Sequence, residues 1–356
     1  MKKTKLLILC NVLIISISSF AYDFKSGDLC YNKISESTSY TVEVTYQNDW
    51  SSSSNYKGLN TITIPSTVNY NGQTYSVTRI GSAAFYGCTD LISVTIPNSV
   101  TTIIEWAFQD CSSLTAINIP TDHTIFSSEQ GVLFNKQRTE LIWYPSGKTG
   151  SYDIPNSVTT IGEGAFTNCT GLTSITIPSS ITNVGSEAFE GTPWLNSKPD
   201  GLVYINNVLY SYKGNMPANT TIVIPDGTIA ISGFAFYECS NLISVTIPSS
   251  VTNIGTGAFC NCTNLTSVSI PSSVTSIDSW VFFGCTKLTA INVPVEHTTL
   301  SSENGVLFNK QKTTLIWYPN GKVGAYSIPN SVTTIGESAF TNCTGLTSVT
   351  IPSSVT

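Results

Sequence analysis

A unit of about 23 residues recurs along this chain, and a repeat of this length constrains the fold more than any other feature. The unit reads I-G-x-x-A-F-x-x-C-x-x-L-x-S-V-T-I-P-x-S-V-T-x. Its phenylalanine lies at Phe85, Phe108, Phe166, Phe189, Phe236, Phe259, Phe282 and Phe340. A unit this short cannot bury its apolar face alone, so neighbouring units must stack into a solenoid.

Each unit contains a short alternating segment that predicts a β-strand. After Cys169, the apolar residues Leu172, Ile175 and Ile177 alternate with Thr and Ser, and Pro178 ends the segment. We therefore predict a mostly β repeat solenoid, coiled right-handedly, with one parallel sheet. Its strands are expected at Leu91–Ile96, Leu114–Ile119, Leu172–Ile177, Leu242–Ile247, Leu265–Ile270, Leu288–Val293 and Leu346–Ile351.

Three segments interrupt the period and predict hairpins. Residues 22–79 contain the turn signal Tyr70-Asn71-Gly72, and we expect a β-hairpin cap there. Residues 126–153 carry GVLFN and ELIWYP around a polar turn, and residues 192–223 carry GLVYI and VLYSY around two asparagines. We expect both inserts to pad the spacing between coils as strand pairs laid into the stack.

The repeats also form a longer cassette. Residues 80–182 align without a gap to residues 254–356 at an offset of 174, with 72 identities in 103 positions. We therefore predict a cap at 22–79 and a solenoid at 80–356, with one full cassette (80–253) and a partial second copy (254–356). An open last coil would expose core side chains, so we expect the natural chain to continue beyond Thr356.

The first 21 residues predict a secretory signal peptide. Three lysines precede an apolar run at 6–17, and Ser19-Phe20-Ala21 forms a small-x-small cleavage site. Removing this leader changes the formal net charge from −6 to −9. An acidic chain without a basic run argues against nucleic acid and anionic membranes as partners. We expect an exported mature chain, extracellular or on the cell surface, with no membrane insertion.

Nine cysteines remain after the leader, so at least one of them cannot pair within the chain. Seven follow the repeat phenylalanine by three positions, where Thr192 is the exception: Cys88, Cys111, Cys169, Cys239, Cys262, Cys285 and Cys343. Side chains that point in parallel from stacked coils seldom meet disulfide geometry. We expect these seven to be reduced, buried small hydrophobes. Cys30 and Cys260 lie outside this series and are expected to be the more reactive ones.

Catalytic and metal-binding patterns are not evident in the sequence. The two histidines, His123 and His297, occupy the same cassette position, and one enzyme rarely needs its base twice, so we expect turn residues rather than a catalytic base. Cys260-x-Cys262 is too close for a zinc pair and has no partner pair. We predict no enzymatic activity, no cofactor and no metal. Asn-x-Thr sequons occur at Asn168, Asn219, Asn261 and Asn342.

Two sets of residues are candidates for ligand contacts. Small polar side chains at outward strand positions suit either a solvated sheet face or a broad contact surface. Aromatic residues at repeat positions that are otherwise small or polar suit binding anchors, although about half would then only cover neighbouring coils. The candidates are Thr95, Asn118, Thr176, Thr246 and Asn292 on strands, and Tyr86, Trp106, Tyr237, Trp280 and Phe283 among the aromatics.

The pattern I-P-x-S-V-T-x-I-G-x-x-A-F-x-x-C-x-x-L-x-S-V closely resembles the Bacteroides surface protein A-like leucine-rich repeats, also called the Treponema pallidum type. The resemblance covers about residues 58–356, with eight copies of the unit. It implies a leucine-rich-repeat solenoid on an exported or cell-surface protein. Characterised members of this family are adhesins, and the resemblance provides no catalytic residues.

Three functions follow as hypotheses. The first is an adhesion module that binds an extracellular protein, such as host matrix, or the surface of another cell. The second is a glycan-binding module in which Trp106 and Trp280 stack on sugars. The third is a passive stalk that holds a further C-terminal domain away from the cell.

Overall fold

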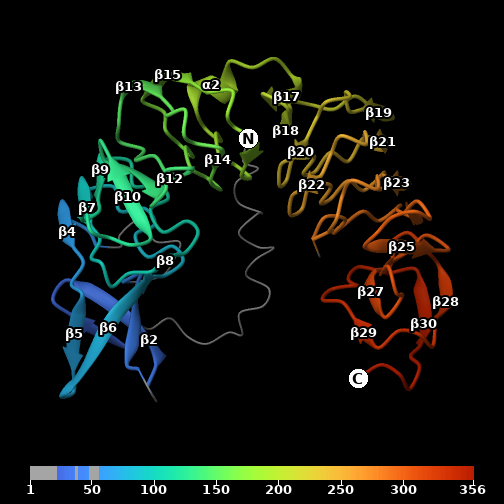
Figure 1. Cartoon of the computed structure of the whole chain (residues 1–356), viewed down its shortest axis with the longest axis horizontal. Helices are drawn as coiled ribbons and strands as arrows, with labels where there is room; N and C mark the ends of the chain where they lie inside the picture. Colours follow the sequence, from blue (N-terminus) through green and yellow to red (C-terminus); the bar gives the residue numbers. More distant parts are fainter. Residues whose placement is uncertain (1–21, 37–38, 48–55, 279) are drawn as a thin grey trace. The chain divides into compact units, whose positions relative to one another are not determined.

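A computed structural model describes residues 22–36, 39–47, 56–278 and 280–356, and the expected leader lies outside the described residues. The chain divides into two compact units. The first unit runs to Gly131 and includes 145–147, and the second unit comprises 132–144 and 148–356. Each unit is a stack of coils built from short β-strands (Figure 1).

The first unit begins with a mixed sheet in the order β1-β2-β3-β6-β5, with β8 paired to β6. Asn71 and Gly72 have φ of 50° and 81°, and they join β5 to β6 as the sequence predicted. The strands are β1 (Phe24–Ser26), β2 (Leu29–Ser35), β3 (Thr41–Thr45), β5 (Thr67–Tyr70), β6 (Gln73–Ile80) and β8 (Thr102–Ile103). The first unit also contains β10 (Phe126–Glu129).

One series of parallel strands, which we name the Ser-Val-Thr row, coincides with the S-V-T segment of the repeat. In the first unit it comprises β4 (Thr61–Thr63), β7 (Ser93–Thr95) and β9 (Ala116–Asn118). In the second unit it comprises β13 (Gly150–Asp153), β15 (Leu172–Thr176), β19 (Thr220–Val223), β21 (Leu242–Thr246), β23 (Ser267–Ser269), β24 (Ala290–Asn292), β28 (Gly324–Ser327) and β30 (Leu346–Thr350). The strands lie where alternation predicted them, but they are three to five residues long.

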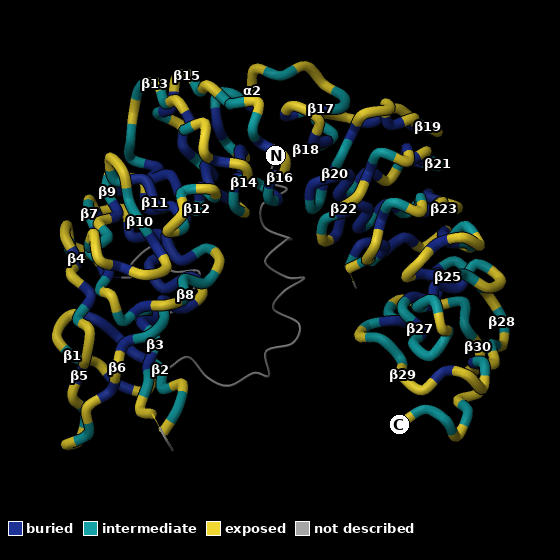
Figure 2. The backbone as a smooth tube through the Cα atoms, in the orientation of Figure 1, coloured by how far each residue is buried: buried dark blue, intermediate teal, exposed yellow. Residues whose placement is uncertain are grey.

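A second series, the Thr-x-Ile row, runs along the opposite side of the second unit (Figure 1). Its strands have only two residues: β14 (Thr160–Ile161), β16 (Asn183–Val184), β20 (Ala230–Ile231), β22 (Asn253–Ile254) and β29 (Thr334–Ile335). Many residues of the segments that link the two rows are buried, and these segments are dark blue in Figure 2. Most coils of the second unit therefore contribute one strand to each side of the core.

The expected single parallel sheet is wrong. The seven predicted strands are distributed over four sheets: β4-β7-β9, β13-β15, β19-β21-β23-β24 and β28-β30. Two of these sheets end at a hairpin turn, which accepts the hydrogen bond that a further strand would otherwise accept. The N–H groups of Ile117 and Ile291 donate to the carbonyls of Gly131 and Gly305, both at 2.9 Å. A turn in place of a strand interrupts the ladder, although the coils continue to stack.

The inserted hairpins form as predicted, but they are coils of the solenoid rather than padding. The pairs are β11 (Val132–Asn135) with β12 (Glu140–Trp143), β17 (Gly201–Ile205) with β18 (Val208–Lys213), and β26 (Val306–Asn309) with β27 (Thr314–Trp317), which β25 (Leu300–Glu303) extends. β12, β18 and β27 each pair in parallel with the next Thr-x-Ile strand. Tyr144 then donates its N–H to the Ala165 carbonyl at 2.8 Å, as Phe166 does to Ala188. The tyrosine of each I-W-Y-P segment therefore takes the place of the repeat phenylalanine.

Stacked phenylalanines form the centre of the core. Phe236, Phe259 and Phe282 are each at most 1% exposed, and their rings lie nearly parallel with centroids 5.3 and 5.9 Å apart. Phe85 stacks on Phe108 at 5.5 Å in the first unit. Because neighbouring coils place aromatic rings at the same position, one truncation leaves a gap that the adjacent coils cannot fill by themselves.

The repeat cysteines are thiols rather than disulfides, as predicted, and all are buried except the half-buried Cys343. Their sulfur atoms hydrogen-bond across coils: Cys262 Sγ lies 3.1 Å from the Phe236 carbonyl oxygen, and Cys285 Sγ lies 3.0 Å from that of Phe259. Burial raises the pKa of Cys285 to about 12, which disfavours the reactive thiolate. Cys30 and Cys260 are also buried, so the prediction that they are the accessible, reactive cysteines is wrong.

Thr192 replaces cysteine for a local reason. It is the N-cap of the short helix α2 (Pro193–Asn196), where its Oγ1 accepts a hydrogen bond from the Leu195 N–H at 3.2 Å. Proline at the first helical position favours the same start. A thiol is a weak acceptor and would cap this turn poorly.

Candidate binding surface

The candidate polar contacts all lie at the ends of strands in the Ser-Val-Thr row. Asn118, Thr176, Thr246 and Asn292 are exposed, and Thr95 is half-buried. Alternation along each strand points the central apolar residue into the core, so these flanking side chains face outward.

In the second unit these side chains form columns across neighbouring strands. The pairs Val245–Val268 and Val268–Ile291 align in register and are buried, which fixes the register of the outward positions. One outward column consists of Thr221, Ser244, Ser267 and Ala290, and the other of Val223, Thr246, Ser269 and Asn292. Neighbouring strands are about 4.8 Å apart, so the columns form a regular array of small side chains.

The side chains of this outward array differ in their hydrogen bonding from other threonines of the repeat. Thr115, Thr266 and Thr289 donate their hydroxyls to carbonyls of the preceding coil at 3.2 Å, so their role is to join coils. By contrast, the side chains of Thr246, Ser269 and Asn292 have no hydrogen-bond partner among the described residues. Their donors and acceptors face solvent and are available to a ligand.

The candidate aromatics lie elsewhere, in the turns around the repeat Ala-Phe or Val-Phe pair. Trp106 and Trp280 directly precede this pair, and Tyr86, Tyr237 and Phe283 directly follow it. The residue directly before this pair adopts a left-handed conformation with φ between 54° and 63° at Ala83, Trp106, Gly164, Glu187, Phe234, Gly257 and Ser338. Glycine suits this region, whereas a large side chain there is strained and is often found at functional sites. Trp106, at φ 61°, is half-buried and is therefore a good candidate anchor.

Phe234 is a further candidate that the sequence reading missed. It has φ of 55°, is half-buried, and its ring lies over Gly257 of the next coil, where a Cβ would collide with it. Phe234 directly precedes the repeat pair Ala235-Phe236, as Trp106 precedes Ala107-Phe108. This shared repeat position is the sequence signal that could have identified Phe234 as a candidate.

The remaining aromatic candidates are less accessible than expected. Tyr237 is only 8% exposed and packs edge-on against Phe234, with ring centroids 5.7 Å apart. Phe283 is half-buried against the core and contacts Trp280 at 5.0 Å. Tyr237 and Phe283 therefore cover coils, and each contacts a half-buried ring, Phe234 and Trp280 respectively.

Tyr86 is half-buried in the corresponding turn of the first unit. Burial and the neighbouring Asp110 carboxylate raise its pKa to about 12, so it stays a neutral hydroxyl at physiological pH. The aromatic turns and the strand ends lie at different points of each coil. The structure thus separates the predicted contacts into a polar strand face and an aromatic turn edge.

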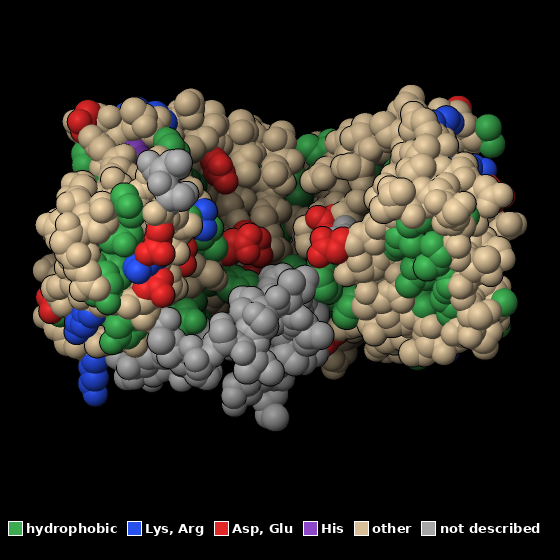
Figure 3. Space-filling model, turned by 90° about the horizontal axis from the view of Figure 1, so that it is seen from below, with side chains coloured by type: hydrophobic (Ala, Val, Ile, Leu, Met, Phe, Trp, Pro, Cys, Tyr) green, Lys and Arg blue, Asp and Glu red, His purple; other side chains and the backbone are tan. Residues whose placement is uncertain are grey.

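The surface carries few charges. On the face drawn in Figure 3 most atoms belong to uncharged polar side chains or to backbone, and charged side chains are scattered. No described helix is long and apolar enough to cross a membrane. Across the described ranges, no group of three metal-ligating side chains comes together.

Both histidines are turn residues, as predicted. His123 and His297 are buried, and the Nδ1 of each accepts two backbone N–H bonds at 3.1–3.2 Å. Three sequon asparagines, Asn168, Asn261 and Asn342, have φ between 56° and 59° at the position before the repeat cysteine. Asparagine tolerates this conformation well, which explains the recurring N-C-T without glycosylation.

Comparison with known proteins identifies related sequences and structures. The family model described as BspA type leucine rich repeat region matches six copies, over residues 30–130, 59–150, 142–216, 205–318 and 317–356. A leucine rich cell surface protein from Faecalibacterium prausnitzii is 27% identical, with 94% of this chain and 77% of the other covered and a TM-score of 0.36.

Two further solved structures are more distant. A leucine-rich repeat protein from Eubacterium ventriosum is 22% identical over 84% of this chain and 74% of its own, with a TM-score of 0.36. The leucine rich repeat protein of T. pallidum is 16% identical over 88% and 76%, with a TM-score of 0.20. None of the curated proteins matches the chain.

Proposed function

Because the chain belongs to the BspA type leucine-rich repeat family, we propose that it is a secreted or cell-surface module that binds an extracellular protein. Export is supported by the leader at 1–21, whose lysines, apolar run and small-x-small site form a secretory signal. Host matrix or the surface of another cell is the proposed partner, which makes the protein an adhesin.

The observation that carries this proposal is the array of outward side chains on β19, β21, β23 and β24. Thr246, Ser269 and Asn292 keep their hydrogen-bonding groups unused within the described chain, although the coils use similar threonines to hold themselves together. A protein partner can satisfy many such groups at once over a broad face, and uncharged side chains cost little to desolvate compared with ions.

The aromatic turn edge would supply the anchors. Aromatic residues dominate binding energy when a partner buries them, and Trp106 and Trp280 are half-buried and lie in turns rather than in the core. The rival function, glycan binding, rests on the same rings, because a tryptophan next to a second ring, as at Trp280 and Phe283, can stack on a sugar. The proposal includes no catalytic step, cofactor or metal.

The mature chain should bind immobilised fibronectin, laminin or collagen and should give no signal on a glycan array. Binding to glycans alone would favour the rival function. Binding to neither would favour the passive stalk and contradict the proposal.

Replacing Trp106 and Trp280 together by alanine should weaken binding to the protein partner at least about 30-fold, since truncating even one buried aromatic anchor costs about 2 kcal/mol. Both side chains are half-buried, so the melting temperature should stay within a few degrees of the wild type. Surface plasmon resonance and circular dichroism measure the two effects. Trp317→Ala is the control, because this 1% exposed side chain belongs to the core and its loss should lower the melting temperature. Unchanged binding by the double variant would remove these two residues from the site.

A further inference from the structure

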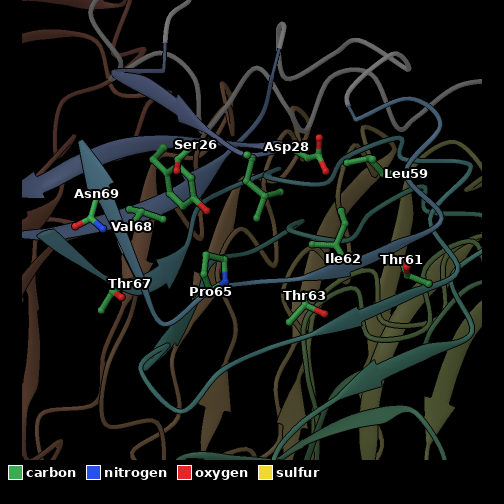
Figure 4. Close-up of a pocket in the computed structure, with 13 residues that line it drawn as sticks. Ser26, Asp28, Leu59, Thr61, Ile62, Thr63, Pro65, Thr67, Val68 and Asn69 are labelled. Carbon is green, nitrogen blue, oxygen red and sulfur yellow. The ribbon is translucent and has the colours of Figure 1, made fainter. Parts of the chain in front are cut away.

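A cavity in the first unit lies beside β4, the end strand of the Ser-Val-Thr row there. It has a volume of about 430 Å³ and is lined by the turn between β1 and β2 and by residues of β4 and β5. Figure 4 shows Thr67, Val68 and Asn69 on one side of it and Leu59 and Thr61 on the other. This volume falls within the range of ordinary ligand sites.

One wall of the cavity is a free edge of β4. The β7 residue Ser93 donates its N–H to the Asn60 carbonyl at 3.2 Å, and Ile64 donates its N–H to the Thr95 carbonyl at 3.0 Å. In a parallel ladder, the backbone N–H and C=O groups of alternate residues point to the same neighbouring strand. Those of Asn60, Ile62 and Ile64 point to β7, and those of Thr61 and Thr63 point away from it. Among the described residues no backbone partner is present on that side of Thr61 and Thr63.

The opposite wall is a free edge of β5. This strand is the last in its sheet and pairs only with β6. Tyr70 and Gln73 close a two-residue hairpin. The Val77 N–H donates to the Ser66 carbonyl at 3.0 Å. The backbone groups at the alternate positions Ser66, Val68 and Tyr70 therefore point to β6. The backbone groups of Thr67 and Asn69 therefore point away from β6, and both residues line the cavity.

The remaining lining defines what could fill the space between these edges. The side chains of Leu29, Tyr31, Ile62 and Val68 are buried and form an apolar wall. Asp28, in the turn between β1 and β2, is the one charged residue of the lining, and it is exposed. Unpaired strand edges with an apolar wall favour an extended main chain, and a lone carboxylate favours a cation.

We propose that this cavity binds a short extended peptide of a partner protein by strand addition. The peptide hydrogen-bonds to Thr61 and Thr63 on β4, to Thr67 and Asn69 on β5, or to both edges. It places an aliphatic side chain against Ile62 and Val68 and a lysine or arginine near Asp28. Main-chain bonds provide affinity in this mode, and the alternating side chains provide specificity.

The segment recognised is short. β4 has three residues, and Pro65, which follows it closely and lines the cavity, has no N–H to offer. Two outward residues on each edge therefore limit the pairing to about three or four peptide residues. Short strand edges next to a proline also limit edge-to-edge pairing with the sheet of another molecule. The site can therefore pair with a short peptide but not with a long strand.

The test uses fluorescein-labelled pentapeptides TVTVK, TITIK and SLSLK with the mature chain, read by fluorescence anisotropy. At least one should bind saturably, and N-methylation of its two aliphatic residues should weaken binding at least tenfold, because the methyl group removes the donors that strand addition needs. The same sequence ending in glutamate instead of lysine should bind more weakly, and Asp28→Asn should reduce that difference.

Variants of β4 locate the site. Thr63→Pro removes an N–H that faces the cavity without removing a bond to β7, and should weaken the peptide at least tenfold. The matched control Thr63→Ala keeps the N–H and should bind as the wild type does. Hydrogen exchange at the Thr61 and Thr63 amides should slow when the peptide is bound.

Failure of all three peptides to bind would overturn the proposal, as would equal binding of the N-methylated form. Should Thr63→Pro fail to fold, the N-methylated peptides and the exchange measurement still decide the matter. None of these outcomes bears on the face of β19, β21, β23 and β24, because the peptides and variants address residues 26–69 only.

Discussion

Replacing Phe259 by alanine should lower the free energy of unfolding by about 3–5 kcal/mol. The ring is fully buried between Phe236 and Phe282, with centroids 5.3 and 5.9 Å away. Its removal leaves a cavity in the middle of a stack whose coils are held in register by hydrogen bonds, such as that from the Phe259 N–H to the Val281 carbonyl at 3.0 Å. Chemical denaturation followed by circular dichroism measures the loss.

Phe234→Ala is the matched control, since it removes the same side chain from a half-buried position in a turn, outside the stack of Phe236, Phe259 and Phe282. Its cost should stay below about 1 kcal/mol. If both variants lost equal stability, the phenylalanine stack would not be the centre of the core.

Glu187→Gln should stabilise the protein at alkaline pH. Burial, followed by the charges of Glu190 and Glu163, raises the pKa of Glu187 to about 7 from its usual 4.5. A carboxyl group whose pKa is higher in the folded state favours folding while it is protonated. Its contribution is fully present below pH 4.5 and is lost as the pH rises through about 7. Glutamine keeps the neutral form at every pH.

The free energy of unfolding of the wild type should therefore fall relative to Glu187→Gln by about 2 kcal/mol between roughly pH 5 and pH 8. Denaturation at a series of pH values measures the difference between the two proteins, so other titrating groups cancel. A constant difference between wild type and Glu187→Gln over the whole range would contradict the raised pKa.

The regular part of the fold could be predicted because its signals are local. Alternation at Leu172, Ile175 and Ile177 gives the strand, and repetition of Phe and Cys gives the stacked core. The role of Tyr144 could not be read in the same way, because it takes the position of the phenylalanine only once β12 has paired with β14. Two of the three breaks that divide the Ser-Val-Thr row into four sheets likewise depend on hairpin turns that replace strands.

The candidate surface was only partly predictable. The outward positions Thr246 and Asn292 follow from alternation, and the structure places them on an exposed face. The sequence does not show that Trp106 and Phe234 adopt a left-handed backbone, since that conformation is set by the packing of one coil on the next. The free edges at Thr61 and Thr67 also escape sequence reading, because they depend on which strands remain unpaired.

We propose that the face of β19, β21, β23 and β24 recognises an extracellular protein. The most direct test is the double variant Thr246→Arg and Asn292→Arg, which places two large charges on that face, compared with Ser249→Arg and Ser272→Arg, which add the same charge at exposed turn positions. Surface plasmon resonance against the matrix protein that the mature chain binds should show at least tenfold weaker binding for the first pair and wild-type affinity for the second. Equal affinity of both pairs and the wild type would contradict the claim.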